Sequence, residues 1–254
     1  MVAFCLDPIA RGANHHLLAL DSVDSTNVVA MQKASTGAQD NLWVVTDEQT
    51  AGKGRRGRVW QTSQGNLATS IFINIPRATK NPELLGFVAA IAVAKTVRDV
   101  LGNDASKIAL KWPNDVLVND AKVAGILLEA KSLPRDNLAI IVGMGVNIVS
   151  LPKDVPYKTI ALNQIAPQMS AATLFTELTK NWVETFAIWN YDQGRQQILD
   201  QWRGLACGLG SKILVTRVND YVEGKFAAID DQGRLVVELK NGQNEIISVG
   251  NVQF

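Results

Sequence analysis

The order of hydrophobic and polar residues divides the chain into a long α/β region and a shorter region of strands. In the first region, apolar runs predict buried strands at 42–45, 67–75, 108–112 and 138–143. Helical spacing of apolar residues predicts helices at 28–34, 81–101 and 171–190. Strands at 116–118 and 122–128 flank Asn119-Asp120, which predicts a hairpin.

The pattern changes after residue 210, where short apolar segments alternate with turn residues. Strands are predicted at 212–218, 222–229, 235–239 and 246–249. Four or five strands in so short a stretch indicate a small barrel. We therefore expect a lead-in at 1–20, an α/β (α+β) domain with a mixed sheet flanked by helices at 21–204, and a small β-barrel at 205–254.

Composition narrows the possible functions. The 254 residues are 47% hydrophobic and 19% charged, as in an ordinary globular protein. The net charge is only +1, so any site for a polyanion must be local, and DNA or an acidic membrane is not an expected partner. Two cysteines and two histidines disfavour a disulfide framework, a zinc cluster and a Ser–His–Asp system. No signal peptide or membrane-length apolar run is present, which favours the cytoplasm.

A basic loop between two predicted strands is the first candidate site. Gly52-Lys53-Gly54-Arg55-Arg56-Gly57-Arg58 holds four cations and three glycines in seven positions. Glycines let backbone N–H groups approach a ligand and the cations add charge, which together favour a phosphate. The spacing is neither a Walker loop nor a Rossmann fingerprint. Taken alone, the motif fits a solvated, mobile loop better than a ligand site.

Three other motifs are modest when taken separately. The second motif is Lys111-Trp112-Pro113-Asn114-Asp115, in which a lysine ends a predicted strand. Burying its charge would be costly, so its side chain is expected to point into a cleft. A strand end followed by ordinary turn residues also explains this motif. Gly143-Met144-Gly145-Val146-Asn147 reads as a strand end with close backbone approach or a simple turn. Ser25-Thr26-Asn27 fits either N-capping or contact with a polar ligand. Together, and without an obvious nucleophile, they suit a protein that positions two substrates and stabilises their charge.

The order of these motifs resembles that of biotin–protein ligases. The resemblance covers about residues 20–150 and rests on Asp24–Asn27, Gln49–Gly57, Lys111–Asp115, Lys122–Leu127 and Gly143–Asn147. It implies that the C-terminal barrel is SH3-like. It also implies that MgATP activates biotin to biotinyl-5′-AMP, with release of pyrophosphate. A lysine of a biotin carboxyl carrier protein, a subunit of acetyl-CoA carboxylase, then takes the biotinyl group.

The resemblance also implies roles for individual residues. Lys111 would be the main electrostatic catalyst between the carboxylate and the α-phosphate, assisted by Arg55. The biotin contacts would be Ser25, Thr26, Asn27, Gln49, Lys53, Gly54, Arg55, Lys111, Gly125 and Ile126. The ATP and adenylate contacts would be Arg56, Arg58, Trp60, Asn114, Lys122 and Asn147, with Trp60 stacked on adenine. Asn114 and Asp115 would help to place the nucleotide or its Mg²⁺; no metal ligand is assigned with certainty, and Asp115 is the candidate through MgATP.

Two features depart from the family pattern. Lys53 stands where the family commonly has arginine. The positive charge is kept, but an ammonium cannot make the paired hydrogen bonds of a guanidinium to a carboxylate or phosphate. Only about 20 residues precede the ligase-like region, so we expect no DNA-binding domain and no repressor role. A monomer and a homodimer both remain open.

Three alternatives stay open beside the ligase. The nearest is a lipoate or octanoate ligase or transferase of the same fold, although its Arg-rich and glycine-triplet motifs are missing here. The second is a non-catalytic biotin-binding module. The third is a nucleic-acid binder that uses the basic loop, which would show steep salt dependence.

Overall fold

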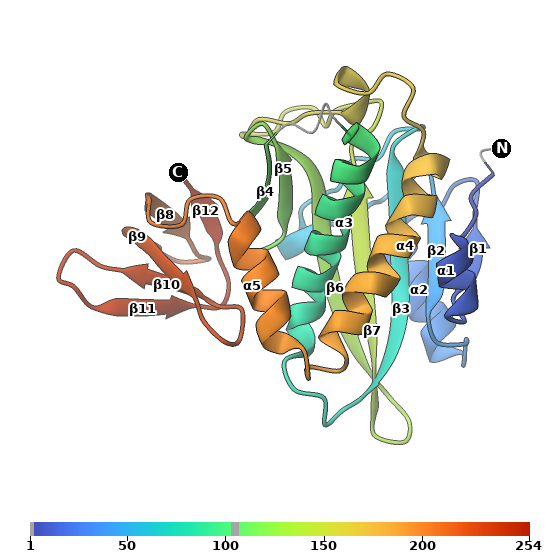
Figure 1. The fold of residues 1–254 in the computed structure, drawn as a ribbon, viewed down its shortest axis with the longest axis horizontal. Coiled ribbons are helices and arrows are strands. Elements are labelled where there is room, and N and C mark those ends of the chain that lie inside the picture. Colours follow the sequence, from blue (N-terminus) through green and yellow to red (C-terminus); the bar gives the residue numbers. More distant parts are fainter. Residues whose placement is uncertain (1–2, 103–106) are drawn as a thin grey trace.

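A seven-stranded mixed sheet organises the larger part of the chain (Figure 1). The computed structural model describes residues 3–102 and 107–254. The strand order is β1-β2-β3-β7-β6-β5-β4; β1 and β2 run parallel and the other neighbouring pairs antiparallel. The strands are β1 (His16–Ala19), β2 (Leu42–Thr46), β3 (Leu67–Pro76), β4 (Ile108–Lys111), β5 (Asp115–Val118), β6 (Ala121–Leu133) and β7 (Asn137–Val146).

Helices cover both faces of this sheet, with α2 on one side and α3, α4 and α5 on the other (Figure 1). Alternate strand residues point to opposite faces, so the apolar runs can bury both. In β2, Val44 packs in a cluster with Ala30 of α2, whereas Trp43 and Val45 belong to the large cluster that includes α3 and α4. The helices are α1 (Pro8–Gly12), α2 (Thr26–Ser35), α3 (Leu85–Leu101), α4 (Ala171–Trp189) and α5 (Arg195–Leu205).

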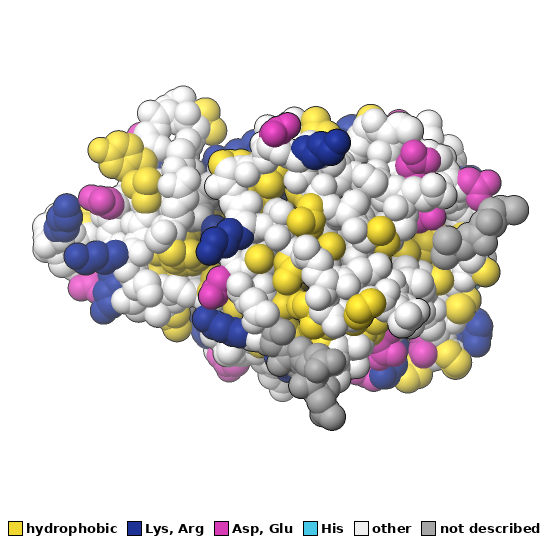
Figure 2. Space-filling model, turned by 90° about the horizontal axis from the view of Figure 1, so that it is seen from above, with side chains coloured by type: hydrophobic (Ala, Val, Ile, Leu, Met, Phe, Trp, Pro, Cys, Tyr) yellow, Lys and Arg dark blue, Asp and Glu magenta, His cyan; other side chains and the backbone are white. Residues whose placement is uncertain are grey.

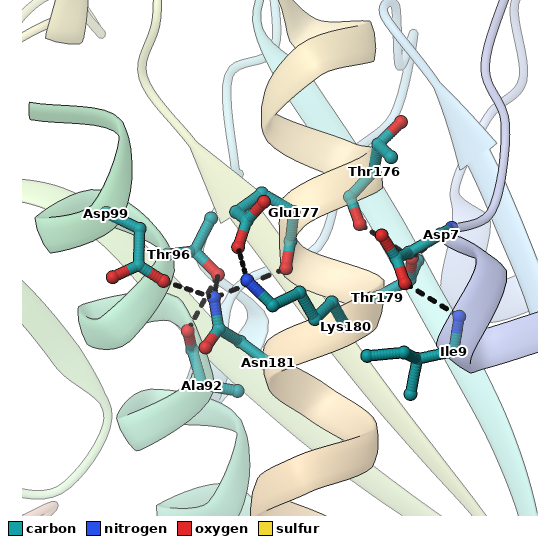
Figure 3. A network of polar contacts seen from close by, with 10 residues as sticks. All are labelled: Asp7, Ile9, Ala92, Thr96, Asp99, Thr176, Glu177, Thr179, Lys180 and Asn181. Atoms are coloured by element: carbon teal, nitrogen blue, oxygen red, sulfur yellow. Dashed lines mark hydrogen bonds and ion pairs between the residues drawn. The ribbon is translucent and has the colours of Figure 1, made fainter.

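A polar network fixes the helices on the outer layer (Figure 3). Asn181 of α4 is 3% exposed and donates to Thr96 Oγ1 (3.2 Å) and Asp99 Oδ2 (3.0 Å) of α3. The Asp7 side chain accepts from the Ile9 N–H (2.7 Å) and caps α1, while the Asp7 N–H donates to Thr179 Oγ1 (3.0 Å). These bonds orient the layer that supports the sheet behind the site.

The predicted elements are present, but several bounds change. The mixed sheet flanked by helices is confirmed, whereas α5 and the two elements of the lead-in, α1 and β1, were not predicted. β7 extends to Val146, so Gly143 and Gly145 lie inside a strand and not after its end. The helix predicted from residue 81 begins only at Leu85; Asn81 has a left-handed backbone (φ 48°) and its side chain donates to Asp192 Oδ2 (3.0 Å). A short 3₁₀ turn, η2 (Pro82–Leu84), leads into α3.

The C-terminal strands form a separate five-stranded antiparallel sheet, in the order β11-β10-β9-β8-β12. Its two outer strands, β11 and β12, are joined by residues 248–250 alone, so the sheet must curl to bring its edges together. The strands are β8 (Lys212–Thr216), β9 (Tyr221–Ile229), β10 (Leu235–Glu238), β11 (Asn244–Ile247) and β12 (Asn251–Gln253).

Specific bonds hold this small barrel against the larger sheet. Trp112 Nε1 donates to the Gly233 carbonyl (3.0 Å), and the Cys207 N–H donates to the Leu110 carbonyl (2.9 Å). Apolar residues of the barrel, including Phe226, join the large hydrophobic cluster. Within residues 3–102 and 107–254, no helix is both long and apolar enough to cross a membrane.

Candidate active site

A cavity of about 320 Å³ opens at the N-terminal end of α2, above β6 and β7. Its volume lies within the range of small-molecule sites. One end is lined by uncharged polar side chains, among them Ser25, Thr26 and Gln49. The other end carries cations from the basic loop and Lys122. The cavity therefore offers one neutral and one electropositive end to a ligand.

The neutral end is held by hydrogen bonds between the start of α2 and the segment after β2. Gln49 Oε1 accepts from the Thr26 N–H (2.8 Å) and from Thr26 Oγ1 (3.1 Å). Gln49 Nε2 donates to Thr62 Oγ1 (3.2 Å). Ser25 occupies the N-cap position and is 2% exposed, yet its side chain caps none of the described N–H groups of α2. Its hydroxyl is thus available to a ligand.

Asn27 is fixed beside this end by two strand residues that the sequence did not single out. Ser70 of β3 donates to Asn27 Oδ1 (2.6 Å), and Asn27 Nδ2 donates to Glu129 Oε2 of β6 (2.7 Å). The Ser70 hydroxyl also lies 2.7 Å from Thr26 Oγ1. A Cβ atom at Gly143 would overlap the Asn27 amide, so only glycine leaves room for this side chain.

Glycines of neighbouring strands form a flat floor under the cavity. Gly125 of β6 and Gly145 of β7 lie directly opposite each other in the sheet. The Trp60 indole packs over both, within 3.0 Å of the place that a Cβ at Gly125 would take. A Cβ at Gly145 would overlap the indole. The glycines therefore let an aromatic ring approach the sheet backbone closely.

The basic loop folds as a compact turn at the cationic end. Gly54 N–H donates to the Arg58 carbonyl (2.7 Å), and the turn η1 (Arg55–Gly57) contains Arg56 with a left-handed φ of 57°. Arg55 Nη1 donates to Asn114 Oδ1 (3.1 Å). Burial lowers the pKa of the Arg55 guanidinium, and the positive charges of Arg56 and Arg58 lower it further, whereas the negative charge of Asp115 raises it. Arginine still remains charged, so Arg55 is a fixed, partly desolvated cation.

Lys122 is the second cation placed firmly at this end. Its Nζ lies 2.6 Å from Asp115 Oδ1, with side chains only 14% and 24% exposed. The same ammonium lies 5.4 Å from the Trp60 ring centroid and 5.3 Å from that of Tyr157. A carboxylate and two aromatic faces thus hold the ammonium in one place.

Most of the residues predicted for the site line this one cavity. They are Ser25, Thr26, Asn27, Gln49, Lys53, Gly54, Arg55, Arg58, Trp60, Asn114, Asp115, Lys122, Gly125 and Ile126. Their segments are far apart in the sequence, so the fold brings the motifs together as the resemblance implied.

Three predicted residues do not line the cavity: Lys111, Arg56 and Asn147. Lys111 sits on β4, the edge strand, and pairs with Asp115 of β5, which pairs with Gly125 of β6. At roughly 4.8 Å per strand, Lys111 is about two strands beyond the floor. Asn147 is buried behind the cavity, where its Nδ2 lies 3.5 Å from the Lys122 carbonyl. The prediction of Lys111 as the central charge is therefore not supported.

Several lining residues were missed by sequence reasoning. Residues 153–157 cover the cavity mouth and contribute Tyr157, and Gln61 Oε1 accepts from the Lys153 N–H (2.9 Å). The segment follows no motif, and its position depends on pairing beside Lys122, whose N–H donates to the Lys158 carbonyl (2.9 Å). Within the described chain, no group of three or more acidic, His or Cys side chains could hold a metal ion.

Comparison with known proteins gives a consistent assignment. The sequence profile of the Biotin/lipoate A/B protein ligase family matches residues 19–147, and that of the Biotin protein ligase C terminal domain matches residues 208–254. The biotin–[acetyl-CoA-carboxylase] ligase of Paracoccus denitrificans is 33% identical over 240 residues, covering 92% of this chain and 99% of the relative. The bifunctional ligase/repressor BirA of Bacillus subtilis is 30% identical over 244 residues, covering 92% and 72%.

A solved structure agrees in fold. The biotin protein ligase from Aquifex aeolicus in complex with biotin and ATP superposes with a TM-score of 0.78. It is 24% identical and covers 94% of this chain and 97% of its own. The two matching profiles, the relatives aligned over most of their lengths and the two-part fold lead to one assignment. The chain belongs to the biotin protein ligases of the biotin/lipoate A/B protein ligase family.

Proposed function

We propose that the chain joins biotin to ATP in this cavity and then transfers the biotinyl group to a lysine of a biotin carboxyl carrier protein. In the first step, a carboxylate oxygen of biotin bonds to the α-phosphorus of ATP. The bond from that phosphorus to the bridging oxygen breaks, and pyrophosphate leaves with the electron pair. The products are biotinyl-5′-AMP and pyrophosphate, with MgATP as the substrate.

One observation carries this proposal: a neutral hydrogen-bonding end and a cationic end share a single cavity. The ureido ring of biotin is neutral and has both donors and acceptors, which suits Ser25, Thr26 and Gln49. The carboxylate and the phosphates are anionic and would lie at the opposite end. Trp60, spread over the glycine floor, offers an aromatic face for adenine.

In this proposal, Lys122 and Arg55 supply the positive charge that stabilises the reacting carboxylate and α-phosphate. A carboxylate that approaches a triphosphate is repelled, and charge shifts onto the phosphate oxygens in the transition state. Preorganised cations lower this barrier because they need no rearrangement during the reaction. Lys122 is preorganised by Asp115 at 2.6 Å and Arg55 by Asn114 at 3.1 Å. Asp115 is then engaged with Lys122, which argues for MgATP arriving as a complex and against a resident metal.

In the second step, the acceptor amine attacks the carbonyl carbon of the mixed anhydride, AMP leaves, and the amine loses a proton.

The proposal also covers the domain boundary, the cellular compartment and the oligomeric state. We place the functional boundary at 204/205, one residue before the end of α5 (Arg195–Leu205) and ahead of the first barrel strand. A reducing, cytoplasmic compartment fits the free thiols of Cys5 and Cys207. A monomer or a homodimer without operator binding remains our expectation.

The test is incubation with biotin, MgATP and a carrier domain, followed by mass measurement. We expect one added biotinyl group on the carrier, and exchange of labelled pyrophosphate into ATP that depends on biotin. Lys122→Ala should slow adenylate formation by about a hundredfold or more, whereas Lys80→Ala on the exposed surface should not. Exchange that depends on lipoate and not on biotin would assign the chain to the other branch of the family.

A further inference from the structure

Glu129 of β6 is a half-buried carboxylate that forms no ion pair with a Lys or Arg side chain in the part of the chain that the structure describes. On the small barrel, by contrast, side chains of both signs lie close together (Figure 2), as in the pair Lys240–Glu223 (3.3 Å). The contact that satisfies Glu129 is a hydrogen bond from Asn27 Nδ2 to its Oε2 (2.7 Å). Because desolvating a charge is costly, this bond is the main compensation for the position of the carboxylate.

A chain of hydrogen bonds continues from this carboxylate to the neutral end of the cavity. Asn27 Oδ1 lies 2.6 Å from the Ser70 hydroxyl, which in turn lies 2.7 Å from Thr26 Oγ1. Thr26 and Asn27 line the cavity, whereas Ser70 is fully buried and, like Glu129, lies outside its wall. We call these four side chains, from Glu129 to Thr26, the Glu129 chain.

The carboxylate fixes the direction of the protons along the Glu129 chain. A carboxylate only accepts, so the Asn27 amide must turn its NH₂ group to Glu129 and its oxygen to Ser70. An amide oxygen also only accepts, so the single proton of the Ser70 hydroxyl points to Asn27. Ser70 is therefore left with lone pairs on the side of Thr26.

Thr26 consequently meets a ligand as an acceptor. Its hydroxyl proton has two acceptors inside the protein, the Ser70 oxygen at 2.7 Å and Gln49 Oε1 at 3.1 Å, so lone pairs remain for the cavity. The Gln49 amide is fixed in this orientation, because its Nε2 donates to Thr62 Oγ1 (3.2 Å). A ring N–H placed against Thr26 gains a hydrogen bond, whereas a ring oxygen or sulfur there leaves polar groups unpaired.

We propose that Glu129 is a positioning residue that, through this chain, keeps the Thr26 hydroxyl as an acceptor and makes the site selective for acids whose ring carries an N–H. The proposal rests on the proposed function, which puts the ureido ring at this end of the cavity. Glu129 acts without touching the ligand. The dithiolane ring of lipoate has no N–H, so the same chain favours biotin over lipoate.

Glu129→Gln is the most direct test, because it keeps the shape of the side chain but can donate as well as accept. Asn27 can then turn over and donate to Ser70, whose proton moves to the side of Thr26. The Thr26 proton is thereby released for a ligand acceptor. Glu129→Asp keeps the carboxylate and is the conservative variant. Glu184→Gln, on the exposed surface of α4, is the matched control.

The experiment compares binding of biotin with that of two analogues by calorimetry on the whole protein, without ATP. In each analogue an oxygen atom replaces one of the two ureido N–H groups. For wild type, we expect one analogue to bind about a hundredfold more weakly than biotin, since it faces Thr26 with an acceptor. Glu129→Gln should narrow that ratio to about tenfold and weaken biotin itself by only about twofold, the cost of two equally populated amide orientations. Glu129→Asp and Glu184→Gln should stay within about threefold of the wild-type ratio.

The ratio of the two affinities is the readout that a merely structural role would not move. If Glu129 only supported the fold, Glu129→Gln would weaken biotin and the analogue equally, and the unchanged ratio would overturn the proposal. Two analogues that bind wild type as well as biotin does would also overturn it. Ser70→Ala interrupts the chain while Glu129 stays in place, and it should narrow the ratio as well. Thermal unfolding measured by circular dichroism checks that each variant is folded at the temperature of the titration.

Failure of the proposed function would look different. A wild-type protein that does not bind biotin at all would overturn that function, and this inference with it. Biotin binding and biotin-dependent adenylate formation, combined with a ratio that is independent of the residue at 129, would refute only the role of Glu129.

Discussion

Substituting Gly143 by alanine tests the construction of the neutral end of the cavity. The new Cβ would overlap the side-chain amide of Asn27, which donates to Glu129 (2.7 Å) and accepts from Ser70 (2.6 Å). The bond to the carboxylate is worth about 1.5–3 kcal/mol and the neutral one about 0.5–1.5 kcal/mol. If the amide is pushed aside and both bonds are lost, the free energy of unfolding should fall by roughly 2–4 kcal/mol.

The same displacement should damage ligand binding, since Asn27 lines the cavity beside Thr26. We expect urea denaturation to show the loss of stability and biotin titration to show at least about tenfold weaker affinity. Gly86→Ala is the matched control: a Cβ there meets nothing within 4 Å, and alanine in a helix should stabilise the protein by about 0.5–1 kcal/mol. If Gly143→Ala behaved like Gly86→Ala in both assays, the reasoning about Asn27 would be refuted.

Three shorter predictions concern other parts of the fold. Burial, followed by the charge of His16, lowers the pKa of His15 to about 4, and its neutral Nδ1 accepts from Trp43 Nε1 (2.9 Å). As pH falls from about 6.5 to 4, His15 becomes protonated in the unfolded chain before it does in the folded protein. The free energy of unfolding should therefore drop by up to roughly 3 kcal/mol over that window. Denaturation curves of His15→Gln should not show this drop. Trp112→Phe leaves a barrel carbonyl without its donor and should cost about 1 kcal/mol in denaturant unfolding; no change would show that this bond does not help hold the barrel. Gly145→Ala should displace the indole of Trp60 and raise the KM for MgATP by about tenfold, the value of one stacked base, with biotin affinity nearly unchanged; an unaltered KM would contradict stacking on adenine.

Local patterns in the sequence predicted most of the elements that build the site. The apolar residues at 171–190 recur at the spacing of one helical face, which predicts a helix, and α4 occupies Ala171–Trp189. The basic loop is also local, and its cations do reach the cavity through Arg55 and Arg58. Contacts between distant segments are different. Ser70 and Glu129 lie 43 and 102 residues from Asn27, and each looks like an ordinary strand residue in the sequence.

Lys111 and Lys122 show why a strand-end lysine cannot be placed from its own motif. Both are near strand ends, and both precede residues that suit a turn or a ligand. What separates them is the order of strands: β4, β5, β6 and β7 form an antiparallel succession that starts at the sheet edge. Lys122 is on the strand beside β7 and lines the cavity, whereas Lys111 is on the edge strand and lines a second cavity between that edge and the small barrel. The motif order alone assigned the central charge to Lys111, because it does not contain the strand order that puts Lys122 at the cavity.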